Sequence, residues 1–280
     1  MAQKNKEEAL AVRLVAGGAT VLAVSVLSDS GMEHYRGSFR DPAMVLPLLS
    51  SAASIGFNAR RAGAHPERAP DSEGTEISHL ISTSIGIIGF GFHAYNVLKR
   101  PGGMRLVNLF YGAPVGAPVA LTLAGALGKT ADALSRNNGM IGPIDLKDGR
   151  VIAGVTSIGL VGTVAEAALL HFRGAYHDPF MWLPIIVPPI AAVSLARDAI
   201  DNVPRPVTTA LLGTTAALGL IGVGFHAYGV ARNMGGWKNW RQNLLAGPPV
   251  PTPPAFTGLA IAGLGALLLM RTAKKKRSHA

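Results

Sequence analysis

The sequence contains no cysteine, which excludes disulfides, thiolate metal sites, cysteine-held iron–sulfur clusters and covalent attachment of haem. Aromatic residues make up only 6% of the chain and charged residues only 15%. An ordinary soluble protein carries considerably more charge than this. The sequence also has no nucleotide-binding loop, nucleophile elbow or zinc-protease motif, so we expect no catalysis of the kind found in soluble enzymes.

The chain is instead rich in apolar residues, which account for 49% of it and give a mean hydropathy of +0.31. Eight stretches are long enough to cross roughly 30 Å of hydrocarbon as helices. They lie at about 10–30, 43–59, 77–98, 114–134, 150–170, 179–197, 206–231 and 253–271. We therefore predict an all-α polytopic membrane protein with eight transmembrane helices, whose first partner is the lipid bilayer.

Two short sequence motifs each occur twice in the chain. Residues 34–42 (HYRGSFRDP) return at 171–179 as HFRGAYHDP, and residues 89–95 (GFGFHAY) return at 222–228 as GVGFHAY. This pattern predicts two tandem four-helix repeats, residues 1–137 and 138–280. Because each repeat has an even number of spans, both should cross the membrane in the same direction.

Basic residues predict the orientation. A net charge of +10 would suggest nucleic acid for a soluble protein, but in a membrane protein the charges of the loops first set the topology. In the eight-span arrangement, seventeen of the 26 lysines and arginines lie on the side of the two termini. We therefore expect both termini in the cytoplasm, a bacterial cytoplasmic (inner) membrane, a basic cytoplasmic tail at 274–277, and no nucleic-acid partner.

Four histidines are the main candidate site residues. His34 and His171 end the first span of each repeat, and His93 and His226 lie near the end of the third, so all four should share one extracytoplasmic layer. Two imidazoles from neighbouring helices of a bundle can hold a b-type haem. We expect haem b, with its iron bound by His34 and His93 in one repeat and by His171 and His226 in the other, or by pairs exchanged between repeats.

Other residues kept in both copies are expected to support such a cofactor. Arg36 and Arg173 can bind haem propionates, because guanidinium groups pair with carboxylates in a bidentate manner. Tyr95 and Tyr228 each follow the second histidine of their repeat by two positions and complete the predicted cofactor-binding set. Glycines near these tyrosines are expected to leave room for a flat macrocycle; they are Gly89, Gly91, Gly222 and Gly224.

Three functional hypotheses follow from these residues. The first is an electron-transfer subunit that acts at the extracytoplasmic face with a partner membrane or extracytoplasmic redox subunit. The second is a cofactor-free anchoring or assembly subunit of a larger membrane complex, since small residues and histidines also serve helix packing. The third is a carrier or binding protein for an anionic or lipid-like ligand, to which the basic loops at 99–105 and 232–238 point.

Carboxylates near the histidines have competing interpretations. Asp29 and Glu166 each precede a histidine by five residues, and a carboxylate in a membrane helix indicates either a proton or substrate path or a packing role. Asp41, before Pro42, is predicted to cap the second span. A non-haem metal site of two histidines and one carboxylate is a further alternative, but no local ligand spacing supports it.

Overall fold

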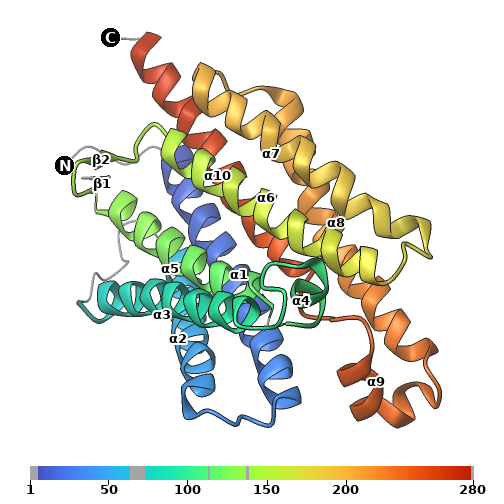
Figure 1. Ribbon diagram of the computed structural model, residues 1–280. Coiled ribbons are helices and arrows are strands. Elements are labelled where there is room, and N and C mark those ends of the chain that lie inside the picture. The colour runs from blue at the N-terminus through green and yellow to red at the C-terminus, as the bar shows by residue number, and fades with distance from the viewer. Residues whose placement is uncertain (1–5, 64–72, 113, 137–138, 279–280) are drawn as a thin grey trace.

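The computed structural model describes residues 6–63, 73–112, 114–136 and 139–278. Within these ranges the chain forms α-helices, three short 3₁₀ helices and one small hairpin (Figure 1). The first part contains α1 (Lys6–Arg36), η1 (Pro42–Val45), α2 (Leu46–Gly63), α3 (Glu73–Leu98), α4 (Leu106–Tyr111) and α5 (Gly116–Ser135). The hairpin is β1 (Met140–Ile141) and β2 (Ile144–Asp145). The second part contains α6 (Arg150–Arg173), η2 (Pro179–Trp182), α7 (Leu183–Asp201), α8 (Pro206–Arg232), η3 (Gly236–Asn239), α9 (Trp240–Ala246) and α10 (Pro254–Ser278).

Seven described helical segments are long and apolar enough to cross a membrane, and each overlaps a predicted span. They are Lys6–Arg36, Pro42–Gly63, Glu73–Leu98, Arg150–Arg173, Pro179–Asp201, Pro206–Arg232 and Pro254–Ser278. The remaining predicted span, 114–134, is also helical as α5 but is not among the seven. This helix carries Lys129 and Asp132, which lower its hydropathy. The structure therefore supports an all-helical protein with seven candidate spans.

The order of elements is the same before and after the hairpin. A long helix, a 3₁₀ turn, two helices, a short helix and a final long helix follow one another in both parts, with η3 added before α9. The hairpin between them pairs Met140 with Asp145 and Ile141 with Ile144, and Gly142 at its turn has a φ of 55°. The boundary predicted at 137/138 lies outside the described residues.

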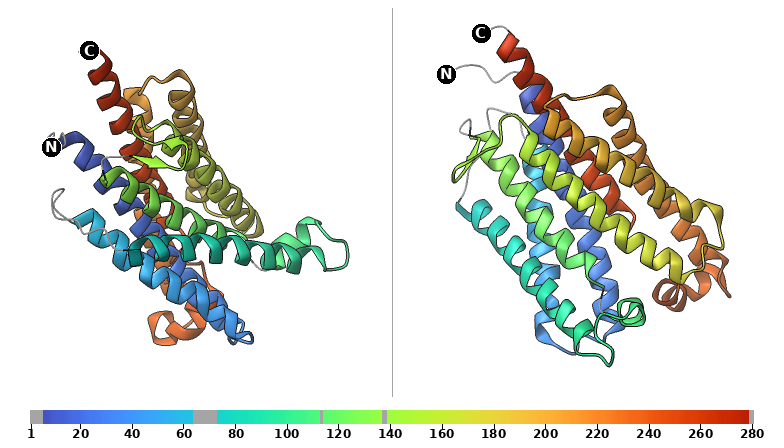
Figure 2. Two further views of the ribbon diagram at one scale, coloured as in Figure 1. Left: turned by 90° about the vertical axis from the view of Figure 1, so that its left-hand side faces the viewer. Right: turned by 45° about the horizontal axis from the view of Figure 1, so that its top comes forward.

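Helices α1 and α10 form the centre of the molecule, where they run side by side in all three views (Figures 1 and 2). In their most apolar stretches, 56% and 78% of the residues are buried, against 22% in α2, α3, α7 and α8. Glycines let the two backbones approach: a Cβ atom on Gly18 would lie 2.4 Å from the carbonyl oxygen of Gly258. Such close packing through small residues is a common way for helices to associate in membranes.

The outer helices expose large apolar side chains. Ile158, Val193, Ile200 and Leu220 are between 62% and 75% exposed. Scattered apolar residues are normal on a soluble surface, but here they extend over several long apolar helices. A hydrocarbon environment removes the cost of exposing them, which favours a lipid bilayer as the surroundings of this bundle.

The bundle has two distinct ends. The N- and C-termini lie together at one end, called here the termini end (Figure 2). The short helices α4 and α9, the 3₁₀ turns η1 and η2, and the last turns of α1, α3, α6 and α8 lie at the opposite end. That opposite end carries the four predicted histidines and is called the histidine end below.

Candidate functional site

Matched turns follow α1 and α6 and bring a backbone carbonyl back to a histidine. Ser38 and Phe39 have φ values of 60° and 46°, and Ala175 and Tyr176 have values of 57° and 47°. Such left-handed conformations are uncommon for residues other than glycine. Both turns lead to an aspartate before proline. The repeated geometry therefore fixes the position of the chain ten residues after each histidine.

The aspartates cap these turns as predicted. Oδ1 of Asp41 accepts a hydrogen bond from the backbone N–H of Ala43 at 2.8 Å, and Oδ1 of Asp178 accepts one from Phe180 at 2.9 Å. Proline occupies the first position of η1 and of η2. The predicted cap at Asp41 is confirmed, although it caps a 3₁₀ turn that leads into α2.

All four histidines hydrogen-bond to a backbone carbonyl through Nδ1. The distances are 2.7 Å from His34 to the oxygen of Met44, 2.8 Å from His171 to Met181, and 2.7 Å from His226 to Pro249; His93 makes the same contact with Pro114. A carbonyl oxygen can only accept, so Nδ1 must carry the hydrogen. In each neutral ring Nε2 then keeps its lone pair, which is the state of a histidine that binds a metal.

Two of the four histidine rings, those of His171 and His226, lie close together in the structure. The ring centres of His171 and His226 are 6.5 Å apart, with an angle of 69° between the ring planes. His34 lies close enough to His93 to act on it electrostatically. The close ring pair of His171 and His226 therefore lies within one half of the chain.

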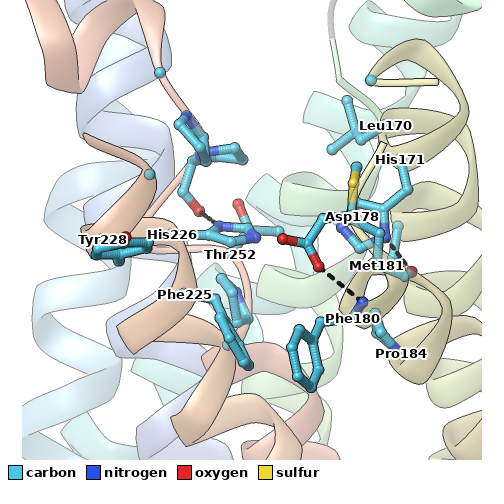
Figure 3. Close-up of a pocket in the computed structure, with 18 of the residues that line it drawn as sticks. Leu170, His171, Asp178, Phe180, Met181, Pro184, Phe225, His226, Tyr228 and Thr252 are labelled. Atoms are coloured by element: carbon cyan, nitrogen blue, oxygen red, sulfur yellow. Dashed lines mark hydrogen bonds between the residues drawn. The ribbon is translucent and has the colours of Figure 1, made fainter. Parts of the chain in front are cut away.

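A cavity of about 550 Å³ opens beside the second pair (Figure 3). His226 lies on one side of it, and His171, Asp178 and Met181 lie on the other. Phe180 and Phe225 stack at its base with their ring centres 4.8 Å apart. Its walls are mainly apolar and aromatic, as is usual for sites that bind organic ligands or cofactors.

The cavity also has a basic residue, Arg232, from the basic loop at 232–238. Arg232 lines it together with Tyr228, and the guanidinium group lies 5.6 Å from the centre of the tyrosine ring. In the first half, the ammonium group of Lys99 lies 5.1 Å from the ring centre of Tyr95. Both tyrosines are mostly exposed. In both pairs the basic residue follows the tyrosine by four positions near the end of a helix. This spacing in the sequence indicates such a contact.

Arg36 and Arg173, predicted to bind propionates, contact the protein itself. Arg36 pairs with Glu33 and donates to the carbonyl of Leu244 at 3.3 Å. Arg173 donates to the carbonyl of Phe110 at 3.1 Å and lies over a tyrosine of the same short helix. Each arginine thus joins the first helix of its own half to the short helix of the other half, and neither is among the residues that line the cavity.

The glycines of the repeated motif differ in their surroundings, and Gly222 is one of the residues that line the cavity. A Cβ atom on Gly89 would contact Pro118 at 3.5 Å, and one on Gly222 would lie 2.9 Å from the side chain of Pro253. These two glycines therefore allow close packing against α5 and the start of α10. A Cβ atom on Gly91 or on Gly224 would meet nothing within 4 Å.

The two carboxylates upstream of the histidines make reciprocal contacts between the halves. Oδ1 of Asp29 lies 3.2 Å from the hydroxyl of Thr252, which donates to it, and Oε1 of Glu166 accepts from the backbone N–H of Gly116 at 3.1 Å. Asp29 and Glu166 also interact electrostatically with each other. They lie on the seam between the halves, while the histidine rings bond to their own loops.

Among the described residues, no three histidine or acidic side chains are arranged to hold a metal ion. The alternative set of two histidines and one carboxylate is therefore not found there.

No protein-family model matches the chain, and comparisons with curated proteins and with solved structures found no match. The functional argument therefore rests on the geometry described above.

Proposed function

We propose that the chain is an integral membrane protein of eight spans, built from two tandem, parallel four-helix repeats. The matched order of elements, the matched turns and the matched histidine contacts support the repeat. Helix α5 is the eighth span; its charged residues face other helices and the termini end instead of lipid. More of the basic residues lie on the side of the two termini than on the other side. This distribution favours a protein in a bacterial inner membrane with both termini in the cytoplasm.

We further propose that the histidine end binds b-type haem and that the protein is an electron-transfer subunit. The observation that carries this proposal is the common state of the histidines. Each ring is fixed by a carbonyl at Nδ1, and the rings are paired with Nε2 available. A carbonyl that bonds to the other ring nitrogen in this way orients a metal-bound histidine and sets its tautomer.

The second pair fits such a cofactor in distance and in surroundings. Two imidazoles that share one metal ion place their ring centres roughly 6 Å apart, since each metal–nitrogen bond is about 2 Å and each centre lies about 1 Å behind its nitrogen. The ring centres of His171 and His226 are 6.5 Å apart. Phe180, Phe225 and Met181 offer apolar contacts, and Arg232 offers a cation for a carboxylate of the ligand.

Bound haem would supply one-electron redox chemistry at this end of the bundle. The residues of the chain hold the ring nitrogens in one tautomer and surround the cavity with apolar side chains. Because both histidine pairs lie at the same end, the layout suits transfer along one membrane face to a partner redox subunit or a quinone. Transport of charge across the bilayer would need a further site.

Spectroscopy on the purified protein tests this proposal. The full chain, expressed with haem available and purified in mild detergent, is expected to show a b-type spectrum after reduction, with two haems per chain. His171→Ala or His226→Ala should halve the haem content, since each removes one ligand of the second pair. His177→Ala is the matched control: this histidine lines the same cavity, but its ring bonds to Gly174 of its own turn and the first half has Arg40 in its place. It should leave the haem content unchanged.

A preparation with no b-type spectrum, or a haem content that survives both His171→Ala and His34→Ala, would contradict the proposal. A colourless protein that is stabilised by amphipathic anions would instead support the carrier function. The apolar cavity with Arg232 at its edge is the observation that favours this second candidate. Arg232→Ala should abolish such stabilisation, whereas it would leave the axial ligands of a haem in place.

A further inference from the structure

A second polar site lies inside the first half, away from the histidine end. His79 of α3, Asn58 of α2 and Asp132 of α5 are each at most 2% exposed. Arg61 is also buried, and its Nε donates to Oδ1 of Asp132 at 2.6 Å. Nε2 of His79 lies 3.3 Å from the other carboxylate oxygen of Asp132. The carboxylate therefore lies between a guanidinium group and an imidazole within the helix bundle.

Three polar atoms at this site have no hydrogen-bond partner: Oδ2 of Asp132, Nδ1 of His79 and Oδ1 of Asn58. The Asp132 oxygen lies 3.3 Å from Nε2 of His79, whereas Nδ1 of His79 and Oδ1 of Asn58 have no such polar neighbour. Both face the space above Gly128, since a Cβ atom on this glycine would lie 2.6 Å from Nδ1 and 2.5 Å from Oδ1. With the ring hydrogen on Nε2 beside Asp132, Nδ1 and Oδ1 are two acceptors that face each other without a donor between them. Buried acceptors without a donor are costly, so the site is incomplete as it stands.

In the second half, the position that corresponds to this site is lined by apolar side chains. At the position equivalent to Gly128, a Cβ atom on Gly263 would lie 3.1 Å from Leu195 and 3.2 Å from Leu212. These leucines stand where Asn58 and His79 stand in the first half, and both are fully buried. The fold therefore does not require polar residues at this glycine. Two leucines fill the space, and the asparagine and histidine serve another purpose.

We propose that His79 is a proton acceptor inside the first half of the bundle. A proton taken up on Nδ1 forms the N–H group that Oδ1 of Asn58 lacks, while Asp132, which the ring shares with Arg61, faces the other ring nitrogen and stabilises the charged ring. One N–H bond forms, the proton comes from water, and no electron is transferred. The second half has no such acceptor at Gly263, so the two halves differ in function at this level.

His79 lies in the first two turns of α3, in the part of the bundle nearer the termini end. Glu76 precedes it by nearly one helical turn and is exposed, with its carboxylate 3.5 Å from Lys129 and 3.6 Å from Arg136. The charged groups around His79 are thus Arg61 from α2, Asp132 and Lys129 from α5, Arg136 after α5, and Glu76 on its own helix. Glu76 is the surface carboxylate nearest in sequence to the buried ring, and it can collect protons from water.

NMR of the histidine side chains tests the proposal on the full chain in detergent micelles or lipid nanodiscs. Nitrogen-15 signals of His79, assigned with His79→Leu, should show one protonated ring nitrogen at high pH and two after acidification of the folded protein. Asn58→Leu should reduce the protonated fraction at a given pH roughly tenfold, because the charged ring loses its acceptor. The double variant Asn58→Leu/His79→Leu copies the second half and keeps the fold testable by circular dichroism.

Either of two results would overturn the proposal. If Nδ1 of His79 remains unprotonated at every pH at which the protein is folded, a water molecule alone completes the site and His79 does not accept a proton. An unchanged titration in Asn58→Leu would also contradict the role of the asparagine. Neither result depends on haem, so this proposal and the function proposed for the histidine end can fail separately.

Discussion

The guanidinium group of Arg173 donates a hydrogen bond to the carbonyl oxygen of Phe110, 3.1 Å away, and so fastens the end of α6 to α4 of the other half. Arg36 makes the corresponding contact with the carbonyl of Leu244 in α9. The two halves are thus joined reciprocally at the histidine end. This explains why both arginines are retained in the two copies without requiring that either one binds a ligand.

Arg173→Ala is expected to loosen this connection. It removes a charge-assisted hydrogen bond and a contact with the ring of Tyr111, so the free energy of unfolding should fall by about 1 kcal/mol. Thermal unfolding in detergent, followed by circular dichroism, measures the change. Arg40→Ala, an exposed arginine in the loop after α1, serves as the control and should change the stability by less than about 0.5 kcal/mol. Equal effects of both variants would contradict the connection.

Asp178 is expected to act as a cap through its oxygen and not through its charge. Asp178→Ala removes the hydrogen bond to the N–H of Phe180 and should cost about 1 kcal/mol. Asp178→Asn keeps a side-chain oxygen that can accept this bond, so it should retain most of the stability. If Asp178→Asn is as damaging as Asp178→Ala in thermal unfolding, the carboxylate charge has a role of its own in the cavity.

Gly18→Ala should separate the two central helices. Its Cβ atom would lie 2.4 Å from the carbonyl oxygen of Gly258, and a backbone oxygen can yield only if a helix moves. We expect a loss of about 2 kcal/mol or more in stability, together with reduced yield from the membrane. Gly154→Ala, in a helix where a Cβ atom meets nothing within 4 Å, should be neutral. A neutral Gly18→Ala would show that α1 and α10 are further apart than described.

Asn243 is expected to hold the loop that leads to α9. Its side-chain amide donates to the carbonyls of Met234 and Gly236, at 3.3 and 2.8 Å, and the residue is buried. Asn243→Ala leaves these carbonyls without their donor and should destabilise the protein by about 2 kcal/mol. Gln242→Ala, at the neighbouring exposed position, should have little effect. Proteolysis of the loop after α8 should also become faster only in Asn243→Ala.

Hydropathy and internal repetition predicted most of the helices, because long apolar runs and repeated motifs can be recognised in the sequence alone. Seven predicted spans correspond to helices that are apolar enough to cross a membrane. The span at 114–134 is the exception in composition, since α5 contains Lys129 and Asp132. Its place beside α2 and α3 depends on the contacts of Asp132 with Arg61 and His79, which lie far away in the sequence.

The histidine pairs were predicted, but most of their surroundings were not. The repeat placed His171 and His226 at one end, and the fold then brought them together. The carbonyl partners at Met181 and Pro249 depend on loop conformations that no residue pattern specifies. The polar site around His79 does not follow from the repeat, because His79 has Leu212 as its counterpart and the repeat points only to residues that are the same in both halves.

The central pairing of α1 and α10 has a consequence for biosynthesis. Gly18 and Gly258 touch in the folded protein but are 240 positions apart in the chain. During translation α1 enters the bilayer long before its partner leaves the ribosome. Its glycine face must remain against lipid or a chaperone during that time, so the bundle can close only after α10 has been inserted. Premature termination before α10 would leave a membrane-inserted chain without a centre, which quality-control proteases should remove.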